Sequence, residues 1–119
     1  MGICQDRVVI ITGAGGGLGA AHAKVFAAEG AKVIVNDINQ DAAQKVVDDI
    51  KAAGGDAVVN TSDITNYDDS LNAVKQAIDT YGDLHVVLNN AGINRDRMFA
   101  SMTEADWDAI MAVHLKGHF

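Results

Sequence analysis

A glycine-dense segment near the N-terminus has the composition of a diphosphate-binding turn. The segment Thr12–Gly19 directly follows the apolar run Val8–Ile11 and leads into a helical pattern. Glycines let the backbone approach a ligand closely, and the free N–H groups at the start of a helix carry partial positive charge. Gly13, Gly17 and Gly19 fit a G-x-x-x-G-x-G spacing. The segment therefore predicts a diphosphate site.

A second register of the same segment is also open. Gly15, Gly17 and Ala20 formally match G-x-G-x-x-A, although this register starts farther from the strand end. A P-loop is excluded, because no Gly-Lys-Ser/Thr sequence follows the glycines. A tight strand-to-helix turn that binds nothing is the structural alternative for either register.

Two acidic residues follow the next two apolar runs and could bind the adenosine part of a nucleotide. Asp37 lies about 20 residues beyond the glycines, where a carboxylate can accept hydrogen bonds from ribose hydroxyls. Its charge would repel a 2′-phosphate, and the neighbouring Asn36 and Ile38 supply no cation, so Asp37 favours NAD over NADP. Asp63 could accept a hydrogen bond from the adenine amino group, but a turn before the next helix explains it equally well.

The elements that must position these residues alternate between short apolar runs and amphipathic segments. Strands are expected at Arg7–Thr12, Lys32–Asn36, Ala57–Asn60 and Leu84–Asn89. Helices are expected at Leu18–Glu29, Asp41–Ala53 and Tyr67–Tyr81, with a loop over Asn90–Met102 and a last helix that Thr103 caps and that continues toward Phe119. Helical crossovers return each strand to the same end, so the sequence predicts a doubly wound parallel α/β sheet of order 3-2-1-4.

Helical spacing also predicts which face of each helix is buried. The expected inward residues of the first helix are Leu18, Ala21, Val25 and Ala28. Those of the second are Ala43, Val46, Val47 and Ile50, and those of the third are Leu71, Val74, Ile78 and Tyr81. In the last helix the apolar face carries Trp107, Ile110, Met111 and His114.

The bulk composition limits the class of protein. The chain has 119 residues, 49% of them hydrophobic and 21% charged, which fits one globular domain. The net charge of −7 argues against a nucleic-acid partner, which would need a basic face. No apolar run approaches the ~18 residues of a membrane span, and a single cysteine excludes an intrachain disulfide. We therefore expect a cytoplasmic protein without a membrane partner.

Taken together in chain order, these motifs resemble the short-chain dehydrogenase/reductase family. The matching stretches are Thr12-Gly13-(x)3-Gly17-Leu18-Gly19, Asp37, Asp63-Ile64, Asn89-Asn90-Ala91-Gly92 and Trp107 with Val113-His114-Leu115-Lys116-Gly117. The resemblance implies a Rossmann fold and an NAD-dependent oxidoreductase acting on a small-molecule alcohol or ketone. It implies the cofactor-binding residues Gly13, Gly15, Gly17, Leu18, Gly19, Asp37, Ile38, Asp63, Ile64, Asn90, Ala91 and Gly92.

The stretch Asn90–Met98, with Met102 and Trp107, is similar to 3-oxoacyl-thioester reductases and to hydroxyacyl-CoA dehydrogenases of multifunctional enzymes. This similarity suggests a 3-hydroxyacyl or 3-oxoacyl thioester as substrate. His114 stands where the family usually has Asn, so it is the candidate catalytic residue, as part of a proton relay. A histidine packed on an apolar face is the structural alternative.

The family's catalytic Ser and Tyr-x-x-x-Lys pair have no counterpart, since neither Tyr67 nor Tyr81 has Lys four residues later. We therefore expect residues 1–119 to be an NAD-binding half-domain that ends within the last helix, is inactive alone and associates with itself through its open edge. A non-catalytic nucleotide-binding or assembly module is the alternative, and a flavin- or nucleoside-binding domain is a third. His114 and His118 are spaced for a metal, but no third ligand supports one, so no metal is expected.

Overall fold

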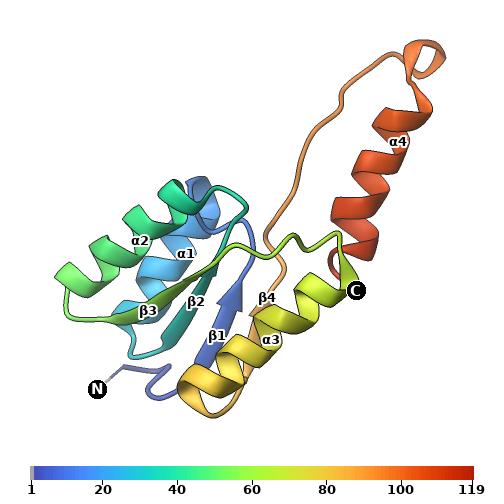
Figure 1. The fold of residues 1–119 in the computed structure, drawn as a ribbon. Coiled ribbons are helices and arrows are strands. Elements are labelled where there is room, and N and C mark those ends of the chain that lie inside the picture. Colours follow the sequence, from blue (N-terminus) through green and yellow to red (C-terminus); the bar gives the residue numbers. More distant parts are fainter. Residues whose placement is uncertain (1) are drawn as a thin grey trace.

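Four parallel strands form the sheet of the computed structural model, which describes residues 2–119. The strands are β1 (Val8–Ile11), β2 (Lys32–Asn36), β3 (Asp56–Asn60) and β4 (Val86–Leu88). Their order is β3-β2-β1-β4, so the chain reverses its direction of winding between β1 and β4 (Figure 1). The predicted strand order and doubly wound α/β class are confirmed.

Four helices connect or follow these strands. They are α1 (Gly17–Ala28), α2 (Gln40–Ala52), α3 (Tyr67–Tyr81) and α4 (Glu104–Met111). Asn39, Asn66 and Thr103 cap α2, α3 and α4, because the side chain of each accepts a hydrogen bond from a backbone N–H of the first turn. A 3-10 turn (Phe99–Ser101) precedes α4, and a π-helical turn (Ala112–Lys116) follows it.

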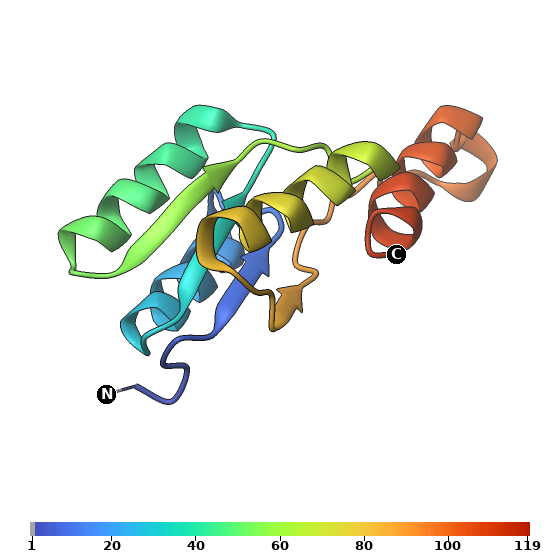
Figure 2. The same cartoon turned by 60° about the horizontal axis from the view of Figure 1, so that its bottom comes forward.

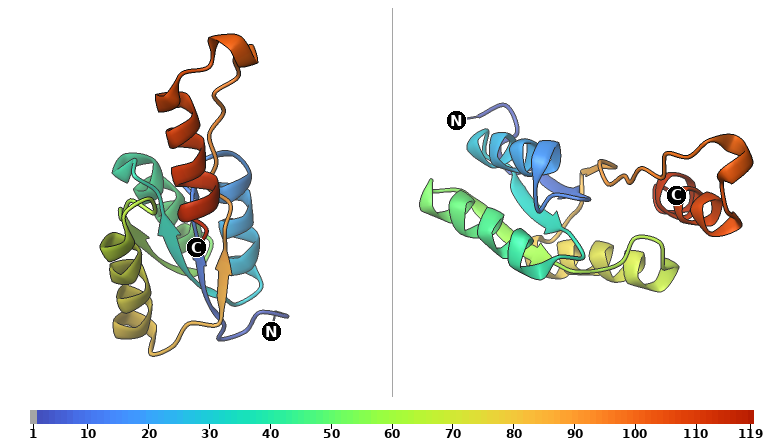
Figure 3. Two further views of the ribbon diagram at one scale, coloured as in Figure 1. Left: turned by 90° about the vertical axis from the view of Figure 1, so that its right-hand side faces the viewer. Right: turned by 90° about the horizontal axis from the view of Figure 1, so that it is seen from above.

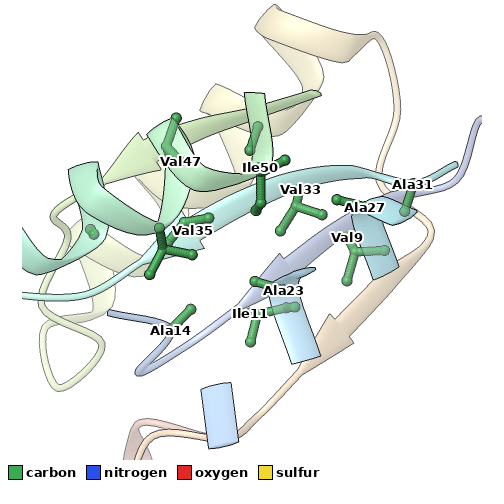
Figure 4. Close-up of a cluster of buried hydrophobic side chains, with 13 residues drawn as sticks. Val9, Ile11, Ala14, Ala23, Ala27, Ala31, Val33, Val35, Val47 and Ile50 are labelled. Atoms are coloured by element: carbon green, nitrogen blue, oxygen red, sulfur yellow. The ribbon is translucent and has the colours of Figure 1, made fainter. Parts of the chain in front are cut away.

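The helices cover the sheet from both sides. One buried cluster joins β1, β2 and β3 to α1 and α2, with Val9, Ile11, Val33 and Val35 facing Ala23, Ala27 and Val47 (Figure 4). A smaller cluster on the other face joins Val8, Ile10 and Ile34 to Ala77 of α3. The left view of Figure 3 shows α1 and α3 on opposite sides of the strands. Both faces of the sheet are thus apolar, as a helix-covered parallel sheet requires.

The predicted inward faces are correct for α2, wrong for α1, and wrong for α3 except at Tyr81, which packs against the smaller cluster. Ala43, Val46, Val47 and Ile50 are all buried in α2. The buried residues of α1 are instead Gly19, Ala23 and Ala27, and those of α3 are Ala73 and Ala77. Small residues of both helices therefore face the sheet. The larger side chains expected inside are left outside: Leu18 is 73% exposed and Val25 63%, and Leu71, Val74 and Ile78 are exposed too.

The chain after β4 leaves the body of the domain. β4 is shorter than predicted, and only β1 pairs with it among the described strands. The following segment carries α4 away from the sheet, so the molecule extends 53 Å along its longest axis (Figures 1 and 2). The predicted last helix is interrupted, because its regular turns end at Met111 and give way to the π-helical turn. Within residues 2–119, no helix has the length and apolar character to span a membrane.

Candidate nucleotide site

A cavity of about 420 Å³ opens at the carboxyl ends of the four strands. This volume lies within the range of small-molecule pockets. The lining residues come from the loops after all four strands: Gly13, Gly16, Asn36, Asp37, Ile38, Ser62, Asp63, Ile64, Thr65, Asn90, Ala91, Gly92, Ile93 and Val113. Most residues of the predicted cofactor site therefore meet here. Gly15, Gly17, Leu18, Gly19 and His114 are not on the cavity wall.

Positive φ values or close packing restrict several glycines of the segment Thr12–Gly19. Gly13 has a φ of +63° and Gly17 of +54°, which favour glycine. A Cβ on Gly19 would lie 2.9 Å from Ala14 Cα, and one on Gly13 would lie 2.9 Å from Ala91 Cα. The spacing of Gly13, Gly17 and Gly19 thus matches positions that the backbone itself restricts.

The N-terminus of α1 differs from those of the other three helices. Gly16 is its N-cap and makes no side-chain capping bond, and the first turn of α1 contains no acidic residue. The first turns of α2, α3 and α4 all contain acidic residues. No capping side chain therefore occupies the N–H groups at the start of α1, and these groups can donate hydrogen bonds to an anion.

Asp37 connects the end of β2 to the glycine loop. Its Oδ2 accepts a hydrogen bond from the backbone N–H of Gly15 over 2.9 Å, and its Oδ1 accepts one from the N–H of Asn39 over 2.9 Å. A Cβ on Gly15 would lie 2.7 Å from the same Oδ2, so this contact depends on glycine. Each carboxylate oxygen has a second lone pair, so Asp37 can still accept hydrogen bonds from a ligand.

Thr12 and Asn90 hold the loops after β1 and β4 together. The Thr12 hydroxyl accepts hydrogen bonds from the backbone N–H groups of Asn90 (3.1 Å) and Ala91 (3.0 Å). Asn90 Nδ2 in turn donates to the carbonyl oxygens of Thr12 and Gly13. The amide nitrogen of Asn90 therefore orders the site rather than projecting toward a ligand. The sequence did not predict the brace from Thr12, because the glycine motif gives this residue no partner.

Asp63 has the local role of a turn residue and also lines the cavity. Its Oδ1 accepts hydrogen bonds from the backbone N–H of Thr65 (2.9 Å) and from the Thr65 hydroxyl (2.7 Å). The turn role and the adenine-binding role are therefore both compatible with the structure. Ile64 follows on the cavity wall.

His114 lies in the π-helical turn and contacts the backbone after β4. Its Nε2 is 3.1 Å from the Ile93 nitrogen and 2.9 Å from the Ile93 oxygen, and the tautomer decides which bond forms. A Cβ on Gly92 would lie 2.8 Å from the His114 ring, so Gly92 makes room for it. His118 Nε2 is 3.2 Å from the Ala91 oxygen. In the described part of the chain, no three His, Cys, Asp or Glu residues gather as a metal site.

Side chains with shifted pKa values lie outside the cavity. The hydrogen bond from the Thr103 backbone N–H to Asp106 Oδ2, followed by a side-chain hydrogen bond of Thr103 and a smaller contribution from Arg97, lowers the pKa of Asp106 at the start of α4. Burial raises the pKa of Tyr81, and the hydrogen bond from its hydroxyl to Asp56 (2.9 Å) adds to this shift. Both groups therefore stabilise the scaffold and contact no residue that lines the cavity.

A chain of buried amides below the cavity was also not predicted. Asn36 and Asn60 end β2 and β3, face each other in the strand register and are only 3% and 6% exposed. Asn36 Nδ2 donates to Asn60 Oδ1 over 2.7 Å, and Asn60 Nδ2 donates to Gln76 Oε1 of α3 over 2.7 Å. The sequence does show an asparagine at the end of each run, which would have been the available signal.

Comparison with known proteins gives a consistent result. The short chain dehydrogenase family model matches residues 7–119. The chain is 49% identical to "Peroxisomal multifunctional enzyme type 2" of Mus musculus over 97% of its length and 16% of that protein. It is 40% identical to "(2S)-[(R)-hydroxy(phenyl)methyl]succinyl-CoA dehydrogenase subunit BbsD" of Thauera aromatica over 100% of its length and 48% of that protein.

Among solved structures, a short chain dehydrogenase from Mycobacterium avium superposes with a TM-score of 0.96 at 53% identity. The match covers 99% of this chain and 44% of that one. The chain therefore spans less than half the length of each of these proteins.

Proposed function

The chain belongs to the short-chain dehydrogenase family, and on this basis we propose that it forms the NAD-binding part of an oxidoreductase that interconverts a secondary alcohol and a ketone. The observation that carries the proposal is the position of Asp37. Its carboxylate lies at the wall of the cavity and is held against the glycine loop by the Gly15 N–H.

The residues present fit a dinucleotide with an unphosphorylated ribose. The restricted glycines leave a path for a diphosphate beside the uncapped start of α1. Asp37 would accept hydrogen bonds from the ribose hydroxyls, and Asp63 and Ile64 would contact the adenine. No Lys or Arg lines the cavity among the described residues, so a 2′-phosphate would meet Asp37 without a compensating cation. These features support NAD rather than NADP.

Bound NAD supplies a hydride acceptor, and NADH supplies the hydride donor. The residues of this chain bind and orient. Asn90 and Thr12 fix the loop that Ala91 and Gly92 continue along the cavity. His114 contacts Ile93 at the far end of this loop. We propose His114 as a member of a proton relay.

We propose a 3-hydroxyacyl or 3-oxoacyl thioester as the substrate. The similarity of Asn90–Met98 to acyl-thioester enzymes supports this substrate, and so does the relative whose name describes an alcohol carried on a CoA thioester. Neither tyrosine in residues 1–119 is followed by Lys at four positions. We therefore propose that residues outside this stretch complete the catalytic site, so that the 119-residue chain alone binds cofactor without turnover.

Self-association and a cytoplasmic location complete the proposal. Trp107, Leu115 and Phe119 are exposed on and after α4, and β4 is an open edge among the described strands, so a second copy of the chain could cover these surfaces. Sedimentation equilibrium tests this self-association, and a monomer at high concentration would contradict it.

A cytoplasmic location is the other part of the proposal. A relative named as peroxisomal makes the peroxisome the alternative compartment, and imaging of the tagged protein decides between the two.

Calorimetric titration with NAD and with NADP tests the proposed function. We expect saturable binding of NAD and at least tenfold weaker binding of NADP, because Asp37 would meet the 2′-phosphate. Circular dichroism of the same sample shows whether the protein is folded. A folded protein that binds neither dinucleotide, or that prefers NADP, contradicts the proposal.

A further inference from the structure

Three backbone groups fix the orientation of the buried amides below the cavity. Gln76 Nε2 donates to the Val59 carbonyl over 2.9 Å, so Gln76 must present its oxygen to Asn60. The backbone N–H of Ser62 donates to Asn60 Oδ1 over 3.0 Å, and this bond independently fixes the Asn60 amide. Since a carbonyl can only accept and an N–H can only donate, neither amide can turn over without losing a bond.

Asn36 is the last of the three hydrogen-bonded amides, and its orientation is fixed in the same way. Its Nδ2 donates both to Asn60 Oδ1 over 2.7 Å and to the Ser62 carbonyl over 3.0 Å. Both hydrogens of the Asn36 amide are therefore used. The polar atom that remains available is the oxygen, Oδ1.

Asn36 Oδ1 has no hydrogen-bond partner in the described part of the chain and keeps access to solvent. Within residues 2–119, no donor bonds this oxygen, while every fully buried side-chain nitrogen or oxygen has a partner. Asn36 Oδ1 must therefore keep some access to solvent, although the residue is only 3% exposed. Asn36 is one of the residues that line the cavity, so we assign this solvent access to the cavity side.

We propose that the amide chain Gln76–Asn60–Asn36 makes Asn36 Oδ1 a fixed hydrogen-bond acceptor that selects a nucleotide base with an exocyclic amino group. This inference rests on the proposed function, since it concerns the base of the same dinucleotide. A carbonyl oxygen on the base would face the Asn36 oxygen and leave both without a donor, which is unfavourable in a partly dry site. Asn36 is thus a specificity residue, and Asn60 and Gln76 are positioning residues.

The test compares NAD with nicotinamide hypoxanthine dinucleotide, in which a carbonyl oxygen replaces the adenine amino group. Calorimetry on the unsubstituted protein gives the ratio of the two dissociation constants, which we expect to be at least fivefold in favour of NAD. Equal affinities overturn the inference while leaving NAD binding, and hence the proposed function, intact. Binding of neither dinucleotide overturns both.

Three variants test which residues cause the preference for NAD over the hypoxanthine dinucleotide. Asn36→Leu is expected to lower the ratio of the two dissociation constants about fivefold, mainly by weakening the binding of NAD. Gln76→Leu is expected to lower it as well, because the Asn60 amide loses the acceptor that helps hold it. The matched control is Asn72→Leu, one turn earlier on an exposed position of α3, which should leave the ratio unchanged.

Asp63 could accept a hydrogen bond from the same amino group, but it is unchanged in all three variants. Its contribution to the ratio is therefore the same in each, and a change in the ratio reports on the substituted residue. A ratio that is unchanged in both Asn36→Leu and Gln76→Leu overturns the inference. A ratio lowered only in Asn36→Leu removes Gln76 from it. A general loss of protein stability would weaken the binding of both dinucleotides alike. The ratio of their dissociation constants therefore separates base selection from a structural role.

Discussion

The carboxylate of Asp37 accepts a hydrogen bond from the backbone N–H of Gly15 over 2.9 Å, so the end of β2 is joined directly to the glycine loop. Asp37, which lines the cavity, is thereby joined to a residue 22 positions earlier in the sequence. This contact places a negative charge beside the start of α1, at the point where the ribose of a dinucleotide would lie in the proposed complex.

Replacing this carboxylate should change both affinity and cofactor preference. We expect Asp37→Ala to weaken NAD binding about tenfold or more, because hydrogen bonds to a charged acceptor are lost, and to strengthen NADP binding. The matched control is Asp41→Ala, which removes the same charge from the exposed first turn of α2. Calorimetry with both dinucleotides measures the effect, and equal changes in the two variants would reject the assigned role of Asp37.

Two glycines of the same loop should respond differently to alanine. A Cβ at Gly19 would lie 2.9 Å from Ala14 Cα and 2.5 Å from Asn90 Nδ2, so Gly19→Ala should destabilise the fold by about 1–3 kcal/mol. Gly16 has an extended φ of −168°, and a Cβ there would meet no atom within 4 Å, so Gly16→Ala should cost under about 1 kcal/mol. Urea denaturation compares the two, and equal losses would contradict the packing at Gly19.

The sequence predicted the order of the sheet because each strand is a short apolar run and each connection is helical. It also placed Asp37, Asp63 and Asn90 at one edge, since the carboxyl ends of parallel strands share that edge. Helix faces were less predictable, since in α1 the small residues Ala23 and Ala27 are buried while the larger Val25 is not. Spacing alone ranks large apolar residues as buried, and it carries no information on the distance between a helix and the sheet.

Side-chain networks were the other part that the sequence left open. Asn36 and Asn60 are three-dimensional neighbours because β2 and β3 pair in register, and a pattern of residue types does not state that register. The same holds for the Thr12 hydroxyl, whose two donors come from the loop after β4.

His114 should protect the backbone after β4 from hydrogen exchange. His114→Leu removes the only side-chain nitrogen that contacts the Ile93 N–H among the described residues, so exchange of this amide should accelerate about fivefold. His114→Asn keeps an acceptor and should restore part of the protection. NMR-detected exchange measures both, and equal exchange in the wild type and both variants would show that the contact with Ile93 carries no weight.

The capping box of α4 should weaken in acid. The Thr103 backbone and hydroxyl hold the pKa of Asp106 below its ordinary value of about 3.9. The sign follows from linkage: a lowered folded-state pKa gives stability that is complete above the unfolded pKa and is lost as pH falls through the folded pKa. We therefore expect amide exchange in α4 to accelerate below about pH 4.

Two variants check this assignment by NMR titration of the carboxyl groups. Thr103→Ala should raise the pKa of Asp106 toward its ordinary value, because the side-chain hydrogen bond of Thr103 that lowers this pKa is removed. Glu104→Gln removes an acidic group from the same turn without touching the capping box, so it should leave the Asp106 titration nearly in place. A Thr103→Ala titration that matches the wild type would contradict the proposed cause.

We propose that the cavity between the glycine loop, Asp37 and Asp63 binds NAD. An ¹⁵N NMR titration with NAD tests it most directly, because each backbone N–H reports its own surroundings. We predict saturable shifts of the backbone N–H signals of Gly13, Gly15 and Asp37. The signals of Tyr81 and Asp56, which form a hydrogen bond at the opposite end of the sheet, should not shift. Chemical-shift changes that cluster at that opposite end would contradict NAD binding in this cavity. A folded protein that shows no NAD-induced shift would contradict it as well.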